Sequence, residues 1–238
     1  FFSDEPELGN GALYGKDNFL GTEQDLPWGE AMEAEVSAAL GENWREKLYL
    51  LWREGEEAAL VRSKYMDVLT KLVRSAFSQP VAQWCRDHGV QYIGHVIEDD
   101  GQHCRTGSSL GHYFRGLQYQ DMAGIDDIGG QVIPGMQDTY RHRGFGPKSD
   151  GEFFHFALGK LGASLAQSDE NKKGRTMCEI FGAYGWAEGT PVMKWLLDYL
   201  LVRGVNYFVP HAFSPLFPDP DCPPHFGADG KDPQYVRR

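Results

Sequence analysis

Histidines and acids gather at the end of one short hydrophobic run of the chain. The run 90–97 is rich in β-branched and aromatic residues and predicts a strand, and Glu98, Asp99 and Asp100 follow it directly. Carboxyl and imidazole groups transfer protons or hold a cation, so this strand end predicts acid/base chemistry or metal binding. A solvated acidic loop is the alternative, because loops are usually polar.

A second carboxyl group lies within an apolar run. Residues 175–181 predict a strand, and Glu179 is flanked there by apolar neighbours. Burying an isolated carboxylate is costly unless it is paired, so a glutamate in this place favours a functional role. Tyr184 and Trp186, just downstream, are residue types that stack on sugar faces. An exposed edge-strand glutamate with core aromatics is the alternative.

Glu98 and Glu179 form the predicted catalytic pair. Glycoside cleavage needs one carboxyl group that protonates the leaving oxygen and one carboxylate that activates water or attacks the sugar carbon. Two glutamates at the ends of different strands meet this requirement. A separation of about 5–5.5 Å predicts retention of configuration and one of about 6.5–9.5 Å predicts inversion, and the sequence leaves both open.

Further polar and aromatic residues at strand ends and near residue 112 are predicted to contact a glycoside or oligosaccharide substrate. This set consists of His95, Asp99, Asp100, His103, Arg105, His112, Tyr113, Arg115, Gln131, Tyr184, Trp186 and His211. For His112 and His211 a purely structural role is the alternative.

An acidic turn follows the first residues of the chain. Asp4, Glu5 and Glu7 come directly after a run that predicts the end of a strand. Calcium prefers several carboxylate and carbonyl oxygens. The turn therefore predicts a calcium site or contacts with sugar hydroxyls, and a simple acidic turn is equally consistent with it.

Two kinds of segment must position these groups. Residues 28–89 are helical in pattern, with apolar residues three and four apart, and Pro80 restarts a helix that ends at Gly89. After that, strands and helices alternate. The predicted strands begin at residue 1 and span 90–97, 127–133, 175–181 and 206–211, and the predicted helices span 112–122, 152–166 and 190–204.

This alternation predicts parallel strands joined by right-handed crossovers. No glycine-rich phosphate-binding loop stands at a strand-to-helix junction, and polar groups end several strands, as in a barrel. We therefore expect an α/β fold of the (β/α)8 TIM-barrel type, with one catalytic domain over residues 1–238 and the helical segment 28–89 inserted between strands. Five predicted strands, where a barrel has eight, and Phe1 as the first residue indicate an incomplete barrel.

Charge and hydropathy argue against two classes of partner. The net charge of −11 leaves no cationic stripe for a nucleic acid. No apolar run reaches the ~20 residues that cross a membrane. No signal peptide is visible, which favours a cytoplasmic location, and the four widely spaced cysteines favour reduced thiols.

Several runs together carry a family resemblance. Residues 62–65, 84–89, 178–179, 193–195 and 203–211 resemble the catalytic barrel of family 106 α-L-rhamnosidases and related glycosyl hydrolases of gut bacteria. The resemblance implies inverting hydrolysis with Glu98 as the general acid and Glu179 as the general base. It also implies calcium near the sugar and accessory β-domains outside this chain. The stretch 95–115 departs from the family pattern, so the sugar stays open.

Two other functions fit the same residues. A metal-dependent barrel isomerase or amidohydrolase-like hydrolase would use His95, Glu98, Asp100 and His103 to hold zinc or manganese. A non-catalytic carbohydrate-binding barrel would bind a sugar without cleaving it.

Overall fold

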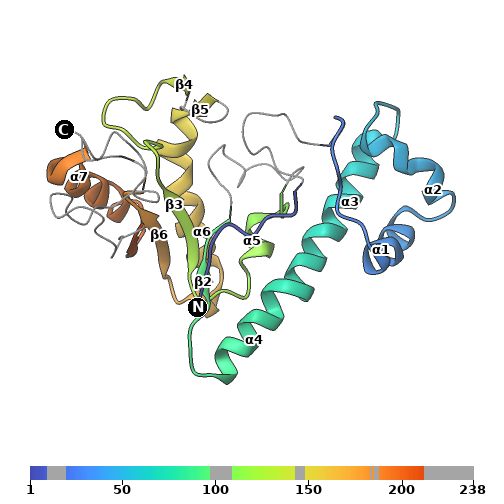
Figure 1. The fold of residues 1–238 in the computed structure, drawn as a ribbon, viewed down its shortest axis with the longest axis horizontal. Helices are drawn as coiled ribbons and strands as arrows, with labels where there is room; N and C mark the ends of the chain where they lie inside the picture. The colour runs from blue at the N-terminus through green and yellow to red at the C-terminus, as the bar shows by residue number, and fades with distance from the viewer. Residues whose placement is uncertain (10–19, 97–108, 143–147, 183, 185–187, 212–238) are drawn as a thin grey trace, which may run out of the picture. The chain divides into compact units, whose positions relative to one another are not determined.

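The computed structural model describes residues 1–9, 20–96, 109–142, 148–182, 184 and 188–211. The chain forms two compact units (Figure 1): unit 1 comprises Phe1–Asp121 with His142–Ser149, and unit 2 comprises Met122–Arg141 with Asp150–Arg238. The described strands lie in separate sheets of two and three strands. Closure into a (β/α)8 barrel, and one domain over the whole chain, stay predictions.

Helices fill most of unit 1, in the region where apolar spacing predicts them. They are α1 (Glu30–Leu40), α2 (Trp44–Lys47), the 3-10 turn η2 (Leu48–Leu51) and α3 (Ala58–Val73). Helix α1 packs against α3. The core between these helices includes Val36, Leu51, Val61 and Tyr65, each at most 1% exposed. Burial of this apolar surface is what holds the helices together.

A π-helical turn joins α3 to the next helix without a break (Figure 1). The turn, η3, spans Arg74–Ser78 and leads directly into α4 (Gln79–Asp87). The predicted restart at Pro80 is therefore wrong, because Pro80 lies in the first turn of a continuous helical path. Proline has no N–H to donate, and the wider π turn ahead of it accommodates the missing hydrogen bond.

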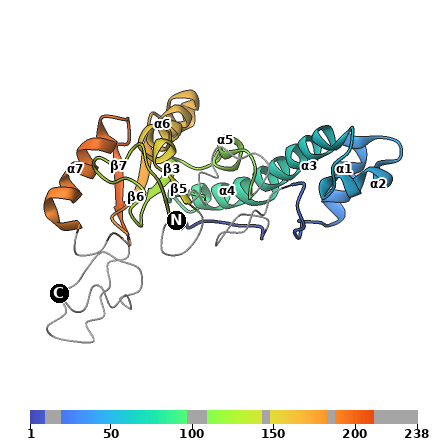
Figure 2. The same cartoon turned by 90° about the horizontal axis from the view of Figure 1, so that it is seen from above.

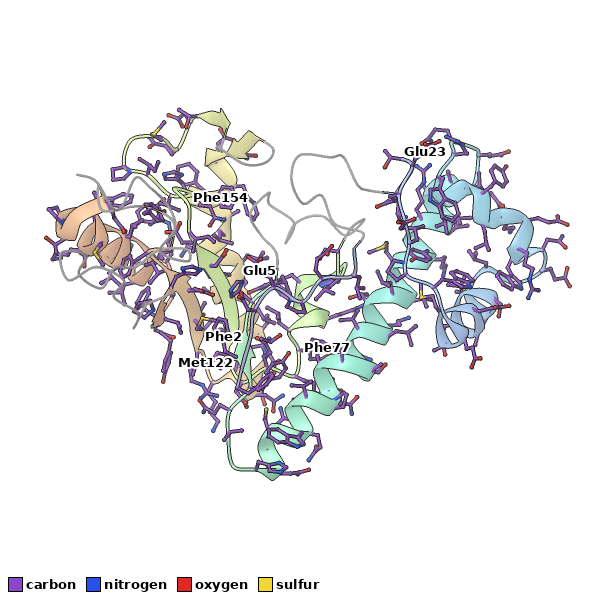
Figure 3. The ribbon with its side chains drawn as sticks, viewed as in Figure 1. Phe2, Glu5, Glu23, Phe77, Met122 and Phe154 are labelled. Atoms are coloured by element: carbon purple, nitrogen blue, oxygen red, sulfur yellow. The ribbon has the colours of Figure 1, made fainter. Side chains whose placement is uncertain are left out.

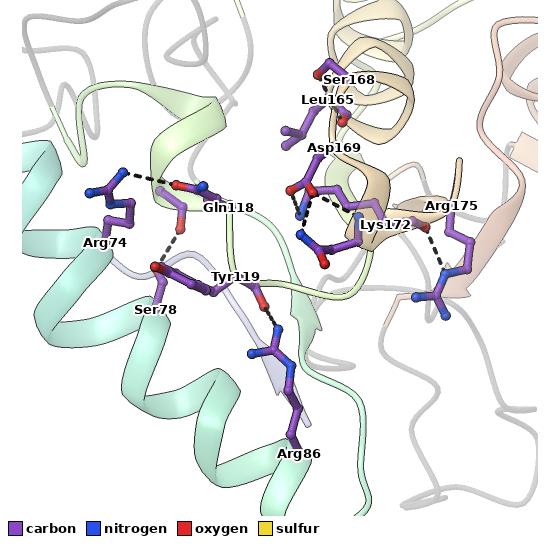
Figure 4. Close-up of polar contacts among 12 residues, drawn as sticks. Arg74, Ser78, Arg86, Gln118, Tyr119, Leu165, Ser168, Asp169, Lys172 and Arg175 are labelled. Carbon is purple, nitrogen blue, oxygen red and sulfur yellow. Dashed lines mark hydrogen bonds and ion pairs between the residues drawn. The ribbon is translucent and has the colours of Figure 1, made fainter.

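Polar side chains tie this helical path to the segment 116–119 (Figure 4). Ser78 Oγ donates a buried hydrogen bond to the Gly116 carbonyl oxygen at 2.6 Å. Arg86 Nη2 donates to the Tyr119 carbonyl oxygen at 3.1 Å. These bonds satisfy one backbone carbonyl at the end of a short helical turn and one just beyond it.

Unit 1 also contains two short parallel strands, β1 (Phe2–Ser3) and β2 (Ile93–Gly94). Phe2 pairs with Ile93 and Ser3 with Gly94. Both strands are shorter than predicted, and the loop residues that follow them lie at the same end of the pair. Behind β2, the buried Cys85 of α4 packs with Tyr92.

The predicted helix over 112–122 is reduced to the single turn α5 (Tyr113–Gly116). Beyond it, hydrogen bonds of the i to i+3 type, such as Gln120 N to the Leu117 carbonyl oxygen, replace the helical pattern. Over a segment this short, the residue pattern does not distinguish a helix from successive turns.

Unit 2 is built on a parallel sheet in the order β3 (Ala123–Asp127), β6 (Thr176–Ile180) and β7 (Tyr207–Pro210). Every residue of β3 and β6 is buried, including the acids Asp126, Asp127 and Glu179, as is typical of parallel strands that are covered on both faces. Cys178 of β6 is completely buried between Ile125 and Phe208, its register partners. The predictions of strands at 175–181 and 206–211 are confirmed to within two residues.

The predicted strand over 127–133 is wrong. The strand is β3, and it ends at Asp127, where the prediction has it begin. Gly129 and Gly130 follow with φ of 58° and 76°, a backbone region that glycine adopts without steric cost. The apolar side chains of Val132 and Ile133 therefore lie in a turn rather than in a strand.

Helical segments cover this sheet. They are the π-helical η5 (Phe153–Leu158), which continues into α6 (Gly159–Ser168), the 3-10 turn η6 (Glu170–Lys172) and α7 (Gly189–Leu201). Helix α6 packs against β3 and β6, and Figure 2 shows it alongside these strands. A small two-stranded sheet, β4 (Tyr140–His142) and β5 (Lys148–Asp150), precedes η5. Among the described helices, none has the length and hydropathy that a membrane crossing needs.

Candidate functional site

The carboxyl ends of β3, β6 and β7 lie at one edge of the parallel sheet. Asp126 is the register partner of Glu179, and Glu179 is the partner of Val209. Register partners on neighbouring strands point to the same face, so Asp126 and Glu179 project side by side. Asp126 is 1% exposed and Glu179 is 8% exposed. The edge therefore places two buried carboxyl groups next to each other.

His211 completes this arrangement. Two residues after Val209, it lies on the same face as Glu179, and its Nε2 is 3.6 Å from Oε1 of Glu179. Its backbone N–H donates to the Ile180 carbonyl oxygen at 2.9 Å, which extends the pairing of β6 and β7. Gly182 leaves room for the imidazole, because a Cβ there would lie 2.4 Å from its Cγ. We call Asp126, Glu179 and His211 the edge cluster.

Asp127 points to the opposite face of the sheet, because side chains alternate along a strand. The Tyr184 hydroxyl donates to Oδ1 of Asp127 at 2.7 Å, and the same hydroxyl accepts from the Val132 N–H at 3.1 Å. Burial, with the nearby Asp127 carboxylate, raises the pKa of Tyr184, so the phenol stays a neutral donor. Burial and the same carboxylate also raise the pKa of Tyr199 on α7, against the opposing effect of Arg203. Asp127 thus faces the helical layer.

Glu188 directly precedes α7 and belongs to this helix-facing group. Burial, followed by the charge of Asp127, raises the pKa of Glu188 from 4.5 to about 8. Its Oε1 is buried and has no hydrogen-bond partner among the described residues. Strongly shifted pKa values often mark functional sites. Here the shift comes from burial and from Asp127, whose side chain points away from the edge cluster, so we place Glu188 outside that cluster.

The backbone after β6 is held in a strained conformation. Phe181 has a φ of 77°, an uncommon value for a residue with a side chain, and it is buried. Such conformations cost about 1–3 kcal/mol and persist where surrounding structure enforces them, often at ligand sites. One enforcing contact is the 2.7 Å hydrogen bond from the Gly129 N–H to the Gly182 carbonyl oxygen. It joins Gly129, which follows β3, to Gly182, which follows β6.

Of the predicted site residues in unit 2, Glu179 and His211 come together, whereas two others are engaged within the protein. Gln131 is completely buried, and its side-chain oxygen accepts from the Ile128 N–H at 3.1 Å. The hydroxyl of Tyr184 is bound to Asp127. Any contact of Tyr184 with a substrate would therefore involve its ring.

His112, Tyr113 and Arg115 belong to unit 1, at α5. His112 is exposed and Tyr113 is 4% exposed. Arg115 donates a hydrogen bond to Asp67. The hydrogen bonds from Lys71 and Arg115 lower the pKa of Asp67 to about 2. The guanidinium group therefore has a structural partner on α3.

The residues near the chain start come together in part. Ligand atoms of Asp4, Glu5 and His95 all lie within 4.8 Å of one another. This group of described residues does not include Glu7. The remaining predicted residues lie outside the described part of the chain: Glu98, Asp99, Asp100, His103, Arg105 and Trp186.

Sequence reasoning missed Asp126, Asp127 and Glu188. A signal for the first two was present, because the apolar residues 122–125 run into two acids in the same way that 90–97 runs into Glu98. The signal was missed because the strand was predicted over 127–133, whereas β3 ends at Asp127. For Glu188 no sequence signal separates a buried glutamate at a helix start from an exposed one.

Comparison of the chain with protein-family models, with curated proteins and with solved structures found no match.

Proposed function

We propose that the chain is the catalytic part of a glycoside hydrolase in which Glu179 is one of two essential carboxyl groups. One observation carries the proposal: Glu179 is buried at the carboxyl edge of a parallel sheet, beside Asp126 and 3.6 Å from His211. Parallel α/β enzymes collect their reacting groups at this edge. The resemblance to family 106 α-L-rhamnosidases supports the same assignment.

In this mechanism Glu179 is the ionised carboxylate. It removes a proton from the attacking water in an inverting reaction, or attacks the sugar carbon in a retaining one. Nε2 of His211 lies 3.6 Å from Oε1 of Glu179, close enough to orient that carboxylate. Gly182 leaves the space that the imidazole occupies, and the backbone hydrogen bond from the His211 N–H to the Ile180 carbonyl oxygen holds His211 beside β6.

The proton donor is the second essential group. Glu98, which lies outside the described residues, is the donor that the family resemblance implies. Asp126 is the carboxyl group beside Glu179 on the same face, and it is the competing assignment. The substrate class is a glycoside or oligosaccharide, and an α-L-rhamnoside is the first sugar to test.

The first experiment compares Glu179→Gln with the parent chain on a panel of aryl glycosides. We expect kcat/KM to fall by about 10²–10⁴-fold on every substrate that the parent cleaves, since proton transfer by a placed side chain contributes this much. Glu98→Gln and Asp126→Asn then identify the acid. The acid variant loses activity on poor leaving groups and keeps it on dinitrophenyl glycosides, which leave without protonation.

Glu188→Gln is the matched control, because Glu188 is a buried carboxyl group of unit 2 that lies near Asp127 and does not belong to the edge cluster. It should keep kcat/KM within about threefold of the parent. Full activity in Glu179→Gln would refute the proposal. Equal losses in Glu179→Gln and Glu188→Gln would indicate damage to the fold rather than to a site.

A further inference from the structure

The ends of β1 and β2 bring three metal-ligating side chains together in unit 1. Asp4 and Glu5 follow β1, and His95 follows β2, at the same end of the parallel pair. Figure 3 shows Glu5 just beyond the strand that carries Phe2. Gly94 permits the close approach, because a Cβ on it would lie 2.1 Å from the Ser3 carbonyl oxygen. The backbone therefore holds Asp4 next to the imidazole of His95.

The imidazole of His95 is fixed in one orientation. The ring is 1% exposed, and it packs edge-on against Phe2 at 5.7 Å between ring centroids. Its Nδ1 lies 3.3 Å from the Val96 carbonyl oxygen, which can only accept, so a hydrogen bond between them requires the proton on Nδ1. In the neutral ring this leaves the lone pair on Nε2. A backbone carbonyl that selects the tautomer is typical of histidines that bind metals.

That lone pair faces a carboxylate. Nε2 of His95 lies 3.3 Å from Oδ1 of Asp4. A nitrogen lone pair and a carboxylate oxygen repel each other at this distance, so a positive charge must lie between them, either a proton or a metal ion. Two ligands each about 2.1 Å from one ion, at angles between about 90° and 109°, are about 3.0–3.4 Å apart. The observed spacing matches that of a shared first-row metal ion.

We propose that Asp4, Glu5 and His95 bind a first-row divalent cation of the Mn²⁺ or Zn²⁺ class. Calcium is bound almost entirely by oxygen ligands, whereas imidazole suits zinc and its neighbours, and carboxylates also suit manganese. The two carboxylates balance the charge of a divalent ion. The side chain of Asp4 is 71% exposed, so the ion is accessible from solvent and its open coordination positions take water. This site does not depend on the proposed function of the edge cluster.

Titration of the full chain with Mn²⁺ tests the site, because the electron paramagnetic resonance signal of the free ion disappears on binding and Mn²⁺ avoids the thiols of the chain. We expect one Mn²⁺ per chain, displaced by stoichiometric Zn²⁺ and not by an equal concentration of Ca²⁺. Asp4→Asn and Glu5→Gln should each weaken Mn²⁺ binding at least about tenfold. Glu7→Gln is the matched control and should leave binding unchanged, because Glu7 is a carboxylate of the same turn outside the group.

Absence of Mn²⁺ binding would overturn the proposal and leave a proton between His95 and Asp4. Equal binding in Asp4→Asn, Glu5→Gln and Glu7→Gln would overturn it as well, since the ion would then lie elsewhere. Displacement of Mn²⁺ by equimolar Ca²⁺ would contradict the assigned class of ion. The buried His95 is left intact, and circular dichroism of each variant confirms that a lost signal does not come from unfolding.

Discussion

At the scale of single residues, the buried acids at the sheet edge are separated by the alternation of side chains along the strands. Asp126 and Glu179 face one side, whereas Asp127 faces the helices, where it accepts from Tyr184 and raises the pKa of Glu188. Adjacent acids in sequence therefore have different environments. Burial and Asp127 raise the pKa of Glu188, whereas Glu179 lies beside His211 and is the group that we expect to react.

The hydrogen bond from Tyr184 to Asp127 can be tested by removing one oxygen atom. Tyr184→Phe leaves a buried carboxylate without its side-chain donor, so the free energy of unfolding should fall by about 1.5–3 kcal/mol, the usual value for a bond to a charged group. Urea denaturation followed by circular dichroism measures the change. Tyr49→Phe, at a tyrosine that is 58% exposed, is the control and should alter stability little. Equal stability of Tyr184→Phe and the parent would mean that Asp127 finds another donor.

At the scale of elements, the sequence predicts the helices and strands whose residue pattern fits only one kind of secondary structure. The helical spacing of 28–89 and the apolar runs at 175–181 and 206–211 correspond to observed helices and strands. The run 127–133 has two interpretations, because Val132 and Ile133 suit a strand whereas Gly129 and Gly130 suit a turn. The glycines decide the outcome. That single error also hid Asp126, so the sequence predicted two of the three residues of the edge cluster, Glu179 and His211.

Packing of η2 against the helices of unit 1 gives a prediction at this scale. Leu51 is 1% exposed within the core of α1 and α3, and Leu51→Ala should lower the free energy of unfolding by about 2–5 kcal/mol through lost contacts and a cavity. Leu60→Ala on α3 is the matched control, because Leu60 is 54% exposed. It should change stability by about 0.5 kcal/mol or less. Chemical denaturation of both variants measures the difference, and similar losses would contradict the described core.

At the scale of the whole molecule, the sequence predicted the parallel pairing but not which strands are neighbours. Strand β3 pairs with β6, about 50 residues further along the chain, and only this pairing puts Asp126 beside Glu179. Residue patterns report burial and periodicity, and they carry no information on which distant segments meet. Likewise, the predicted acidic turn contained Asp4 and Glu5, and the strand pairing supplied His95 in place of Glu7.

The pKa of Glu188 is higher in the folded state than in the unfolded chain, so the free energy of unfolding of the whole molecule depends on pH. The folded chain holds this proton up to about pH 8, and the unfolded chain loses it near the ordinary value of 4.5. The folded state then binds more protons between these values, so this group lowers the free energy of unfolding by at most about 1.4 kcal/mol per unit rise in pH. Its stabilising contribution is complete below about pH 4.5 and is lost as pH rises through about 8.

Glu188→Gln should therefore reduce the fall in stability across that range. Urea denaturation at several pH values between about 5 and 8.5 measures the slopes for the variant and the parent. The variant should be the more stable of the two at the upper end, since glutamine has no proton to release. Parallel slopes would show that Glu188 titrates normally in the folded chain.

Each unit has a buried cysteine whose rate of modification can report how often the structure around it opens. Cys85 belongs to unit 1 and Cys178 to the central strand of unit 2, and both thiols are fully buried and form no disulfide within the described part of the chain. A thiol reagent reaches them only when the surrounding structure opens, so its rate of modification reports the frequency of local opening. With Cys104 and Cys222 replaced by serine, peptide mapping of the modified chain would time the two openings separately. A bound glycoside that slowed only Cys178 would locate its effect in the sheet without any measurement of catalysis.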